Sequence, residues 1–320
     1  MKQIIPFLFT LLTATFLYAQ TQDDNIIIDY KTESFTYKAY SKQVYLVEKT
    51  TANYRSLKWA DKITVVEFYN LYSTINAVDI KAEKTITPTY EMYKDDGVFY
   101  SDRKVCYFEL PFSKKDVKAS VSFTKTHKDI CIFHEIIFPE PQFVKEKKVE
   151  INVPLWMEVE ILEQNFSNNI EKEIVTNVEL QLVTYRYTIR EQEGVKIVDD
   201  APAYHKIVPH LLLIPKKATL KEESILYFNH YDDVYKWCND KIAQTQNDLG
   251  VVSKFTQQLI DTCKTDDEKI SLIFAWVQYN IRYIAFEYGL DSWIPDNAQN
   301  VLRKKYGDCK GMSNLLRIML

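Results

Sequence analysis

The feature that most limits the fold of this chain is a change in the period of its apolar residues. From residue 26 to about residue 214, apolar and polar side chains mostly alternate, which is typical of β-strands with one buried face. After Pro215 the apolar residues recur at helical spacing instead. A long β region followed by helices predicts an α+β fold with two domains, and we place their boundary near residue 218.

The β region consists of short segments rich in β-branched and aromatic residues, separated by polar turns. The predicted strands lie at residues 44–47, 63–69, 105–110, 120–123, 130–138, 148–153, 157–162 and 180–189. Asp95-Asp96-Gly97 and Glu193-Gly194 have the composition of hairpin turns. Many short strands at regular spacing predict an antiparallel β-sandwich over residues 26–217.

The helical region shows both periodicity and capping signals. Helices are predicted at residues 233–244, 253–263, 266–283 and 298–304, and a last one begins at Cys309. Thr265 and Glu268 have the spacing of a capping box, and Asp308 is placed as the N-cap of the last helix. Along that helix, apolar residues form a stripe that Cys309 is expected to begin, and the stripe continues with Met312, Leu315, Leu316 and Met319.

The first 19 residues differ from the rest of the chain. Residues 4–18 are an almost unbroken apolar run after Lys2, and Ala19 precedes Gln20 as a small residue. This pattern predicts a secretory signal peptide, residues 1–19, cleaved after Ala19. The alternative is a membrane anchor, but the run is shorter than the roughly 20 apolar residues that a span needs. The expected location is therefore extracytoplasmic, periplasmic or secreted, with no membrane span after cleavage.

Composition argues against several classes of function. The net charge of −4 is spread among interspersed acidic and basic residues, so no nucleic-acid partner is predicted. With 6 glycines and no glycine-rich helix entry, the chain offers no nucleotide site. His127, Cys131 and His134 do not share one face of an alternating strand, so neither a metal nor any other cofactor is predicted.

Five cysteines are too few for a disulfide scaffold in a chain of 320 residues, and their number is odd. Cys106 and Cys131 lie in strand-like segments, and Cys238 and Cys263 lie in helix-like ones. Either pair can be a bridge or two free thiols, and the sequence leaves both alternatives open.

The fifth cysteine, Cys309, has a setting that favours reactivity. Gly307 permits a sharp entry into the helix, Asp308 caps it, and the thiol sits at the first helical position. Unpaired N–H groups and the helix dipole favour a thiolate there, and the same groups can hold an oxyanion. The alternative is a small buried residue at the start of a helix.

The sequence around Cys309 resembles bacterial transglutaminase-like proteins. The resemblance rests on Gly307-Asp308-Cys309-Lys310, on the helix end at residues 276–283 and on residues 300–305. The β region resembles the domain of unknown function, of the DUF3857 type, that precedes this core in exported bacterial proteins; residues 186–204 fit its end. Gly311 departs from the family pattern, which often has an acidic residue after Cys-Lys.

The resemblance implies a papain-like fold and a Cys-His-Asp triad, with Cys309 at the nucleophile position. It also implies that the histidine and the acid follow the nucleophile helix, whereas all five histidines of this chain precede Cys309. We therefore expect residues 218–320 to be the N-terminal part of a transglutaminase-like domain that is truncated at its C-terminus. Such a chain is expected to show little turnover and to leave the apolar stripe of its last helix partly uncovered.

Two functions remain open at the sequence level. The first is acyl transfer or hydrolysis at amide or peptide bonds of a protein or peptide substrate, through a thioester at Cys309. The second is a non-catalytic binding or scaffolding protein of the cell envelope, with an envelope protein as its partner. Trp293 and Tyr288, in the loop before Cys309, are candidates to line the cleft or to stabilise an oxyanion; for Trp293 the alternative is packing in the domain core.

Overall fold

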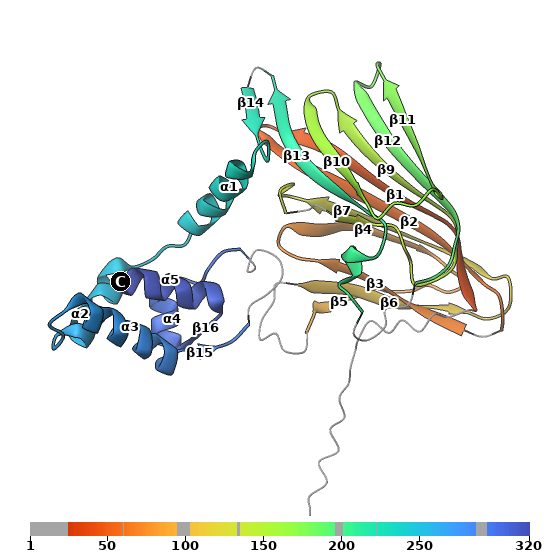
Figure 1. Ribbon diagram of the computed structural model, residues 1–320. Helices are drawn as coiled ribbons and strands as arrows, with labels where there is room; N and C mark the ends of the chain where they lie inside the picture. The colour runs from red at the N-terminus through yellow and green to blue at the C-terminus, as the bar shows by residue number, and fades with distance from the viewer. Residues whose placement is uncertain are drawn as a thin grey trace, which may run out of the picture.

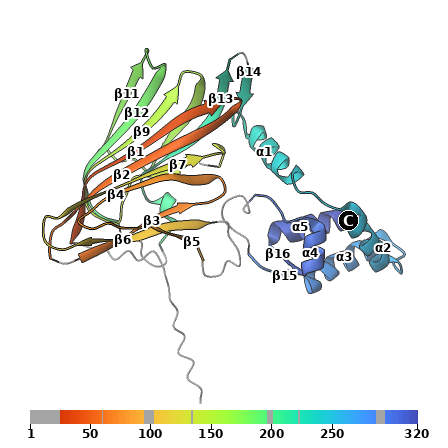
Figure 2. The same cartoon turned by 180° about the vertical axis from the view of Figure 1, so that it is seen from behind.

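A computed structural model describes residues 25–59, 61–94, 103–132, 135–195, 201–221, 223–285 and 293–320. The signal-peptide prediction and Tyr288 fall outside these residues, as does the turn at Asp95-Asp96-Gly97. The described residues form an N-terminal region of β-sheets and a C-terminal region of helices, and the helix α1 (Tyr231–Ala243) joins the two (Figures 1 and 2). The predicted α+β class is confirmed.

One large sheet organises the β region. Its strand order is β11-β12-β9-β1-β2-β7-β4. In chain order these strands are β1 (Ile26–Tyr40), β2 (Gln43–Ser56), β4 (Ser73–Lys81), β7 (Lys118–His127), β9 (Val144–Pro154), β11 (Ile170–Asn177) and β12 (Leu182–Gln192). The neighbouring strands run antiparallel except β1 and β9, which run parallel with Phe35 opposite Ile151. This parallel pair departs from the antiparallel arrangement predicted from the sequence.

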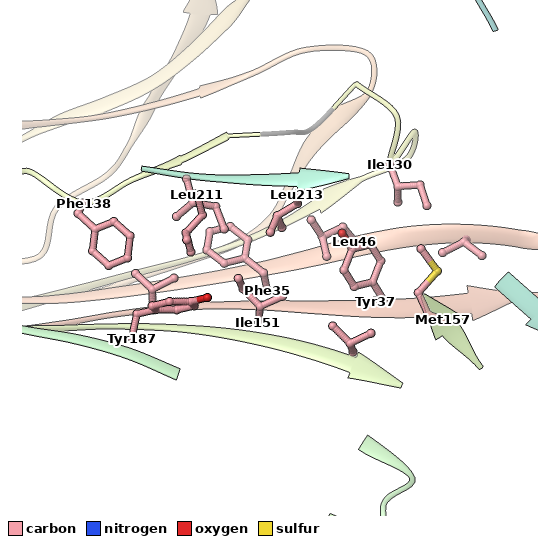
Figure 3. Close-up of a cluster of buried hydrophobic side chains, with 14 of the residues drawn as sticks. Phe35, Tyr37, Leu46, Ile130, Phe138, Ile151, Met157, Tyr187, Leu211 and Leu213 are labelled. Atoms are coloured by element: carbon pink, nitrogen blue, oxygen red, sulfur yellow. The ribbon is translucent and has the colours of Figure 1, made fainter. Parts of the chain in front are cut away.

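Two smaller sheets cover the same face of the large sheet. The first contains β8 (Glu135–Ile137), β10 (Met157–Gln164), β13 (His210–Leu220) and β14 (Glu223–Leu226). The second contains β3 (Asp61–Tyr69), β5 (Thr89–Met92) and β6 (Lys104–Phe112). A short 3-10 turn, Tyr204–Lys206, precedes β13. Under the first sheet, Phe35 and Tyr37 of β1 meet Leu211 and Leu213 of β13 in one apolar cluster (Figure 3). Under the second sheet, Phe108 of β6 packs with other apolar residues on Phe123 of β7.

Buried charges lie on this face beside the two apolar clusters. The Lys125 ammonium lies 2.6 Å from Glu67 and 3.4 Å from Glu48, and the His127 ring nitrogen Nε2 lies 2.7 Å from Glu48. A second group joins Lys31 and Lys147 to Glu33 and Glu140, with nitrogen–oxygen distances of 2.6–3.1 Å. Because each buried charge has an opposite charge beside it, the desolvation cost of the face is offset.

Two local predictions are wrong. Of the described residues in the apolar run 130–138, Glu135–Ile137 form a strand and residues 130–132 do not, because the Asp129 side chain accepts from the Cys131 N–H (3.0 Å) and turns the chain. Glu193-Gly194 is not a hairpin turn, since β12 pairs with β9 and β11 and the next strand belongs to another sheet. Gly194 is instead required by a close approach: a Cβ there would lie 2.4 Å from the Pro141 carbonyl oxygen.

The helical region agrees closely with its sequence signals. After α1 come α2 (Leu249–Ile260), α3 (Asp266–Asn280), α4 (Ala298–Lys304) and α5 (Cys309–Met319). The predicted capping box is confirmed, because Thr265 Oγ1 accepts from the Glu268 N–H and the Glu268 carboxylate accepts from the Thr265 N–H. The last-helix stripe packs among α2, α3 and α4: Leu315 and Met319 are buried, and Met312 and Leu316 are half-buried.

Candidate functional site

The N-terminus of α5 places Cys309, and Asp308 fixes where this helix begins. Asp308 Oδ1 accepts from the Gly311 N–H at 2.7 Å, as predicted for an N-cap. The other oxygen of the same carboxylate pairs with the Lys310 ammonium, and Asp308 itself is only 4% exposed. The cap and its counter-ion therefore hold the first turn of α5 in one geometry.

The chain approaches Cys309 through a tight connection from α4. Lys305 ends α4 in the left-handed conformation (φ 62°), and its N–H donates to the Val301 carbonyl at 2.9 Å. The next two residues form β16 (Tyr306–Gly307), which pairs in parallel with β15 (Arg282–Tyr283) after α3. The Lys305 ammonium lies 4.2 Å from the centre of the Trp276 ring, and burial lowers its pKa. This packing ties the turn before Cys309 to α3.

Cys309 is exposed. The sequence predicted that it begins the inward-facing stripe of α5, and this detail is wrong. The stripe becomes buried one turn later, where Met312 and Leu315 meet the other helices. An exposed thiol at a helix N-terminus is open to a substrate and close to the backbone amides of the first turn, which lack intrahelical acceptors.

Gly311 fits the close approach of α4, α5 and the loop before α4. A Cβ at this position would lie 3.2 Å from Val301 Cγ2, 3.3 Å from Asp308 Oδ1 and 3.8 Å from Asp296 Cβ. Any side chain here would therefore press on α4 and on the cap, and an acidic one would also face Asp308. The glycine at residue 311 thus has a local packing reason.

An amide network behind α5 was not predicted from the sequence. Asn314, 3% exposed, donates from Nδ2 to Asn247 Oδ1 (2.9 Å) and to the Asp296 carbonyl (3.1 Å). Asn247 Oδ1 also accepts from the Ala298 N–H at 2.9 Å, which ties the start of α4 to the loop before α2. The sequence feature that could have indicated this network is Asn314. A polar residue beside an apolar stripe inside a helix is expected to have a hydrogen-bond partner.

Trp293 lies at the surface, 45% exposed, and its ring stands edge-on to Trp237 of α1 with centroids 5.1 Å apart. The loop that it begins reaches α5, where Asp296 lies against Gly311. Tyr288, the other residue proposed for this loop, lies outside the described residues.

The other four cysteines are free thiols. Cys106 is buried, and Cys131, Cys238 and Cys263 are half-buried. Burial, with Asp129 nearby, raises the pKa of Cys131 to about 12, and burial also raises the pKa of Cys106. Both thiols are therefore neutral and poorly nucleophilic near neutral pH, whereas an acyl-transfer nucleophile has to be reactive.

The described histidines lie in or next to the β region. His127 pairs with Glu48, His205 lies in the 3-10 turn, His210 is buried in β13 and His230 caps α1. The residues with described placement contain no group of three potential metal ligands. In the same part of the chain, no helix has the length and apolar character needed to cross a membrane.

Comparison with known proteins agrees with this reading of the helical region. Residues 253–320 match the family model of the transglutaminase-like superfamily. This stretch, which holds most of α2, all of α3 to α5 and Cys309, is therefore a transglutaminase-like domain, as its motifs predicted. No curated protein matches the sequence of the chain.

Among solved structures, the chain is similar to a "putative protease" from Parabacteroides distasonis ATCC 8503. The TM-score is 0.62 at 15% identity, and the match covers 92% of this chain and 58% of that one. At this identity the likeness shows a shared fold, and the chain spans 58% of the length of that protein. A "putative nutrient binding protein" from Legionella pneumophila matches with a TM-score of 0.37 at 9% identity, covering 93% of this chain and 94% of that one.

Proposed function

We propose that Cys309 is the nucleophile of an exported transglutaminase-like enzyme that acts on amide or peptide bonds. The observation that carries this proposal is an exposed thiol at the first residue of α5, fixed by the Asp308 cap, inside a transglutaminase-like domain. The protein from Parabacteroides with the same fold is named a "putative protease", which is in keeping with a peptide substrate.

The chemistry follows from the position of the sulfur. The thiol proton passes to a base, and Cys309 Sγ attacks the amide carbonyl carbon, whose oxygen becomes an oxyanion beside the first-turn amides. The C–N bond breaks, the amine leaves with the proton from the base, and a thioester remains. A second amine or water then attacks the thioester and releases the thiol. The first acceptor gives cross-linking and the second gives hydrolysis.

We propose that the base and the acid that orients it come from residues outside this chain of 320. The four described histidines lie in the β region or at the start of α1, none of them on α2 to α5. The chain also spans only 58% of the length of the Parabacteroides protein. In this proposal the β region is a sandwich of the DUF3857 type, residues 1–19 direct export, and the location is periplasmic or secreted.

Thiol labelling tests the nucleophile. Iodoacetamide at neutral pH is expected to modify Cys309 faster than the half-buried Cys238 and Cys263, as measured by peptide mass spectrometry over time. Turnover is then measured as incorporation of a fluorescent primary amine into a glutamine peptide and as release of new peptide ends. The assay uses a version of the protein that carries any coding sequence downstream of residue 320.

In that version, Cys309→Ala is expected to abolish both signals, and the matched variant Cys263→Ala is expected to keep them. Turnover that persists in Cys309→Ala would overturn the assignment of the nucleophile.

A second candidate function is a non-catalytic binding protein of the cell envelope. It is favoured by a cavity of about 780 Å³ whose lining comes from the β region and α1, with no residue from α4 or α5. This function would be favoured if the longer version shows no turnover but still binds envelope proteins.

A further inference from the structure

The large cavity is an open surface depression where five parts of the chain meet. Its lining comes from the hairpin between β1 and β2, the loops before β4 and after β7, β14 with the residue that follows it, and α1. Its volume of about 780 Å³ lies within the range of pockets that hold small ligands or a few residues of a peptide.

The charge of the lining favours an anion. The lining contains three lysines, Lys42, Lys128 and Lys241, and one carboxylate, Asp129. Lys241 and Asp129 neutralise each other at 2.8 Å and are largely covered. Lys128 is exposed, with its ammonium 3.3 Å from the Leu71 carbonyl. Lys42 pairs with Glu223 at the surface, where both side chains are more than half exposed, and such pairs exchange partners at little cost.

Aromatic rings stand beside these lysines. Tyr72 and Tyr227 are half-buried walls of the cavity. Tyr40 is 80% exposed at the tip of the β1–β2 hairpin, next to Ser41, whose φ of 56° sets the turn. A large exposed aromatic side chain beside cations offers a contact surface for an apolar group that carries a negative charge.

The strand that lines the cavity favours a peptide over a saccharide. Ile225 belongs to β14, which pairs with β13 alone among the described strands. An edge strand presents backbone N–H and C=O groups, and an extended peptide can bind such an edge as an added strand.

We propose that this cavity binds an acidic peptide segment, with its carboxylates on Lys42 and Lys128 and an aromatic or apolar side chain against Tyr40. The site lies at α1: Lys241 belongs to the cavity, and Trp237, one turn earlier, contacts Trp293 in the loop that leads to α4. A peptide bound here occupies the junction between the β region and the transglutaminase-like domain. The proposal does not depend on catalysis at Cys309, because binding is measured without turnover.

Fluorescence anisotropy of a labelled peptide tests the site. The probe is a capped pentapeptide of alternating glutamate and aromatic residues, and its matched control has glutamine in place of each glutamate. The glutamate probe is expected to bind at least about tenfold more tightly than the control, because its carboxylates gain charge-assisted hydrogen bonds. Tetragalacturonate, an anionic saccharide, is expected not to displace it.

Variants of exposed residues locate the binding. Lys42→Gln combined with Lys128→Gln is expected to weaken binding about tenfold, and Tyr40→Ala is expected to weaken it independently. Lys254→Gln, an exposed lysine on α2, serves as the matched control and should bind as the wild type does. Equal binding of the two peptides, unchanged binding in the lysine variant, or displacement by tetragalacturonate would overturn the proposal.

Discussion

Lys147 is a charged residue with no exposed side-chain surface. Its ammonium lies 2.6 Å from Glu140, 3.1 Å from Glu33 and 3.0 Å from the Ile137 carbonyl. These contacts replace the water that a lysine normally holds, so the charge is tolerated only as part of its group. At this scale the β region depends on paired charges as well as on apolar packing.

Lys147→Met is expected to lower the free energy of unfolding by about 3–5 kcal/mol, because it leaves two buried carboxylates with Lys31 as their remaining cation. The length of the side chain is nearly kept, so the loss reports on charge. Lys145→Met, on the same strand but 46% exposed, is the control and should change little. The measurement is urea denaturation at neutral pH, and equal losses in both variants would contradict the expectation.

Glu48 makes stability depend on pH. Burial alone would raise the pKa of Glu48, but the Lys125 ammonium and the hydrogen bond from His127 outweigh it and lower the pKa to about 2, from the usual 4.5. A carboxyl with a depressed pKa stabilises the fold above its unfolded pKa and loses that contribution as pH falls toward its folded pKa.

At neutral pH, Glu48→Gln is therefore expected to be less stable than the wild type by on the order of 3 kcal/mol. The difference should shrink as pH falls from about 4.5 to about 2, where half of the wild-type carboxyl groups are already protonated. Thermal unfolding of both proteins across this range measures it. A constant difference would show that Glu48 acts through packing and not through its charge.

Single residues were predictable where a motif assigns them a role. Asp308 as N-cap and Cys309 as first helical residue follow from their order in the sequence, and the structure confirms both positions. The exposure of Cys309 did not follow, because helical periodicity does not show which turn the neighbouring helices reach. The ion pairs of Glu48 with Lys125 and of Lys147 with Glu33 were also beyond the sequence, since each joins strands distant along the chain.

At the scale of elements, α5 depends on its first turn. Asp308→Ala is expected to destabilise the transglutaminase-like domain by about 1 kcal/mol, because the Gly311 N–H loses its acceptor. Asp308→Asn keeps a capping oxygen and should retain most of the stability. Denaturation followed by tryptophan fluorescence compares the two. If both variants lose the same stability, the charge beside Lys310, and not the capping hydrogen bond, stabilises this turn.

Elements with their own start and stop signals were predicted best. α4 has the predicted residues, and α3 begins where its capping box indicates. The strand prediction for residues 130–138 was wrong because Asp129 bends the chain at a run of β-branched residues. Local composition does not show whether the turn or the strand wins. Strand pairing is the hardest feature to predict from the sequence, because nothing local in β1 shows that β9 lies beside it in parallel.

At the scale of the whole molecule, α1 is a connection exposed to solvent. It has no buried residue, and it contacts its surroundings through Lys241 with Asp129 and through Trp237 with Phe228 and Trp293. Few apolar contacts secure it, so local opening is expected to begin there.

Limited trypsin digestion is expected to cut first within α1, with Lys236 as an exposed site, and to leave the β region intact. Intact-mass analysis of early time points identifies the cut. First cleavage within one of the strands β1 to β13 would contradict this order of stability.

The parallel contact of β1 with β9 also has a consequence for how the molecule is made. β2 follows β1 directly and can pair with it early, but the opposite edge of β1 stays open until β9 has been synthesised. During that interval a strand of 15 residues exposes unpaired backbone N–H and C=O groups to other unfolded chains. The slow step in the biogenesis of this protein is therefore expected to be the late arrival of β9, and chaperone dependence should fall most sharply once residue 154 has emerged.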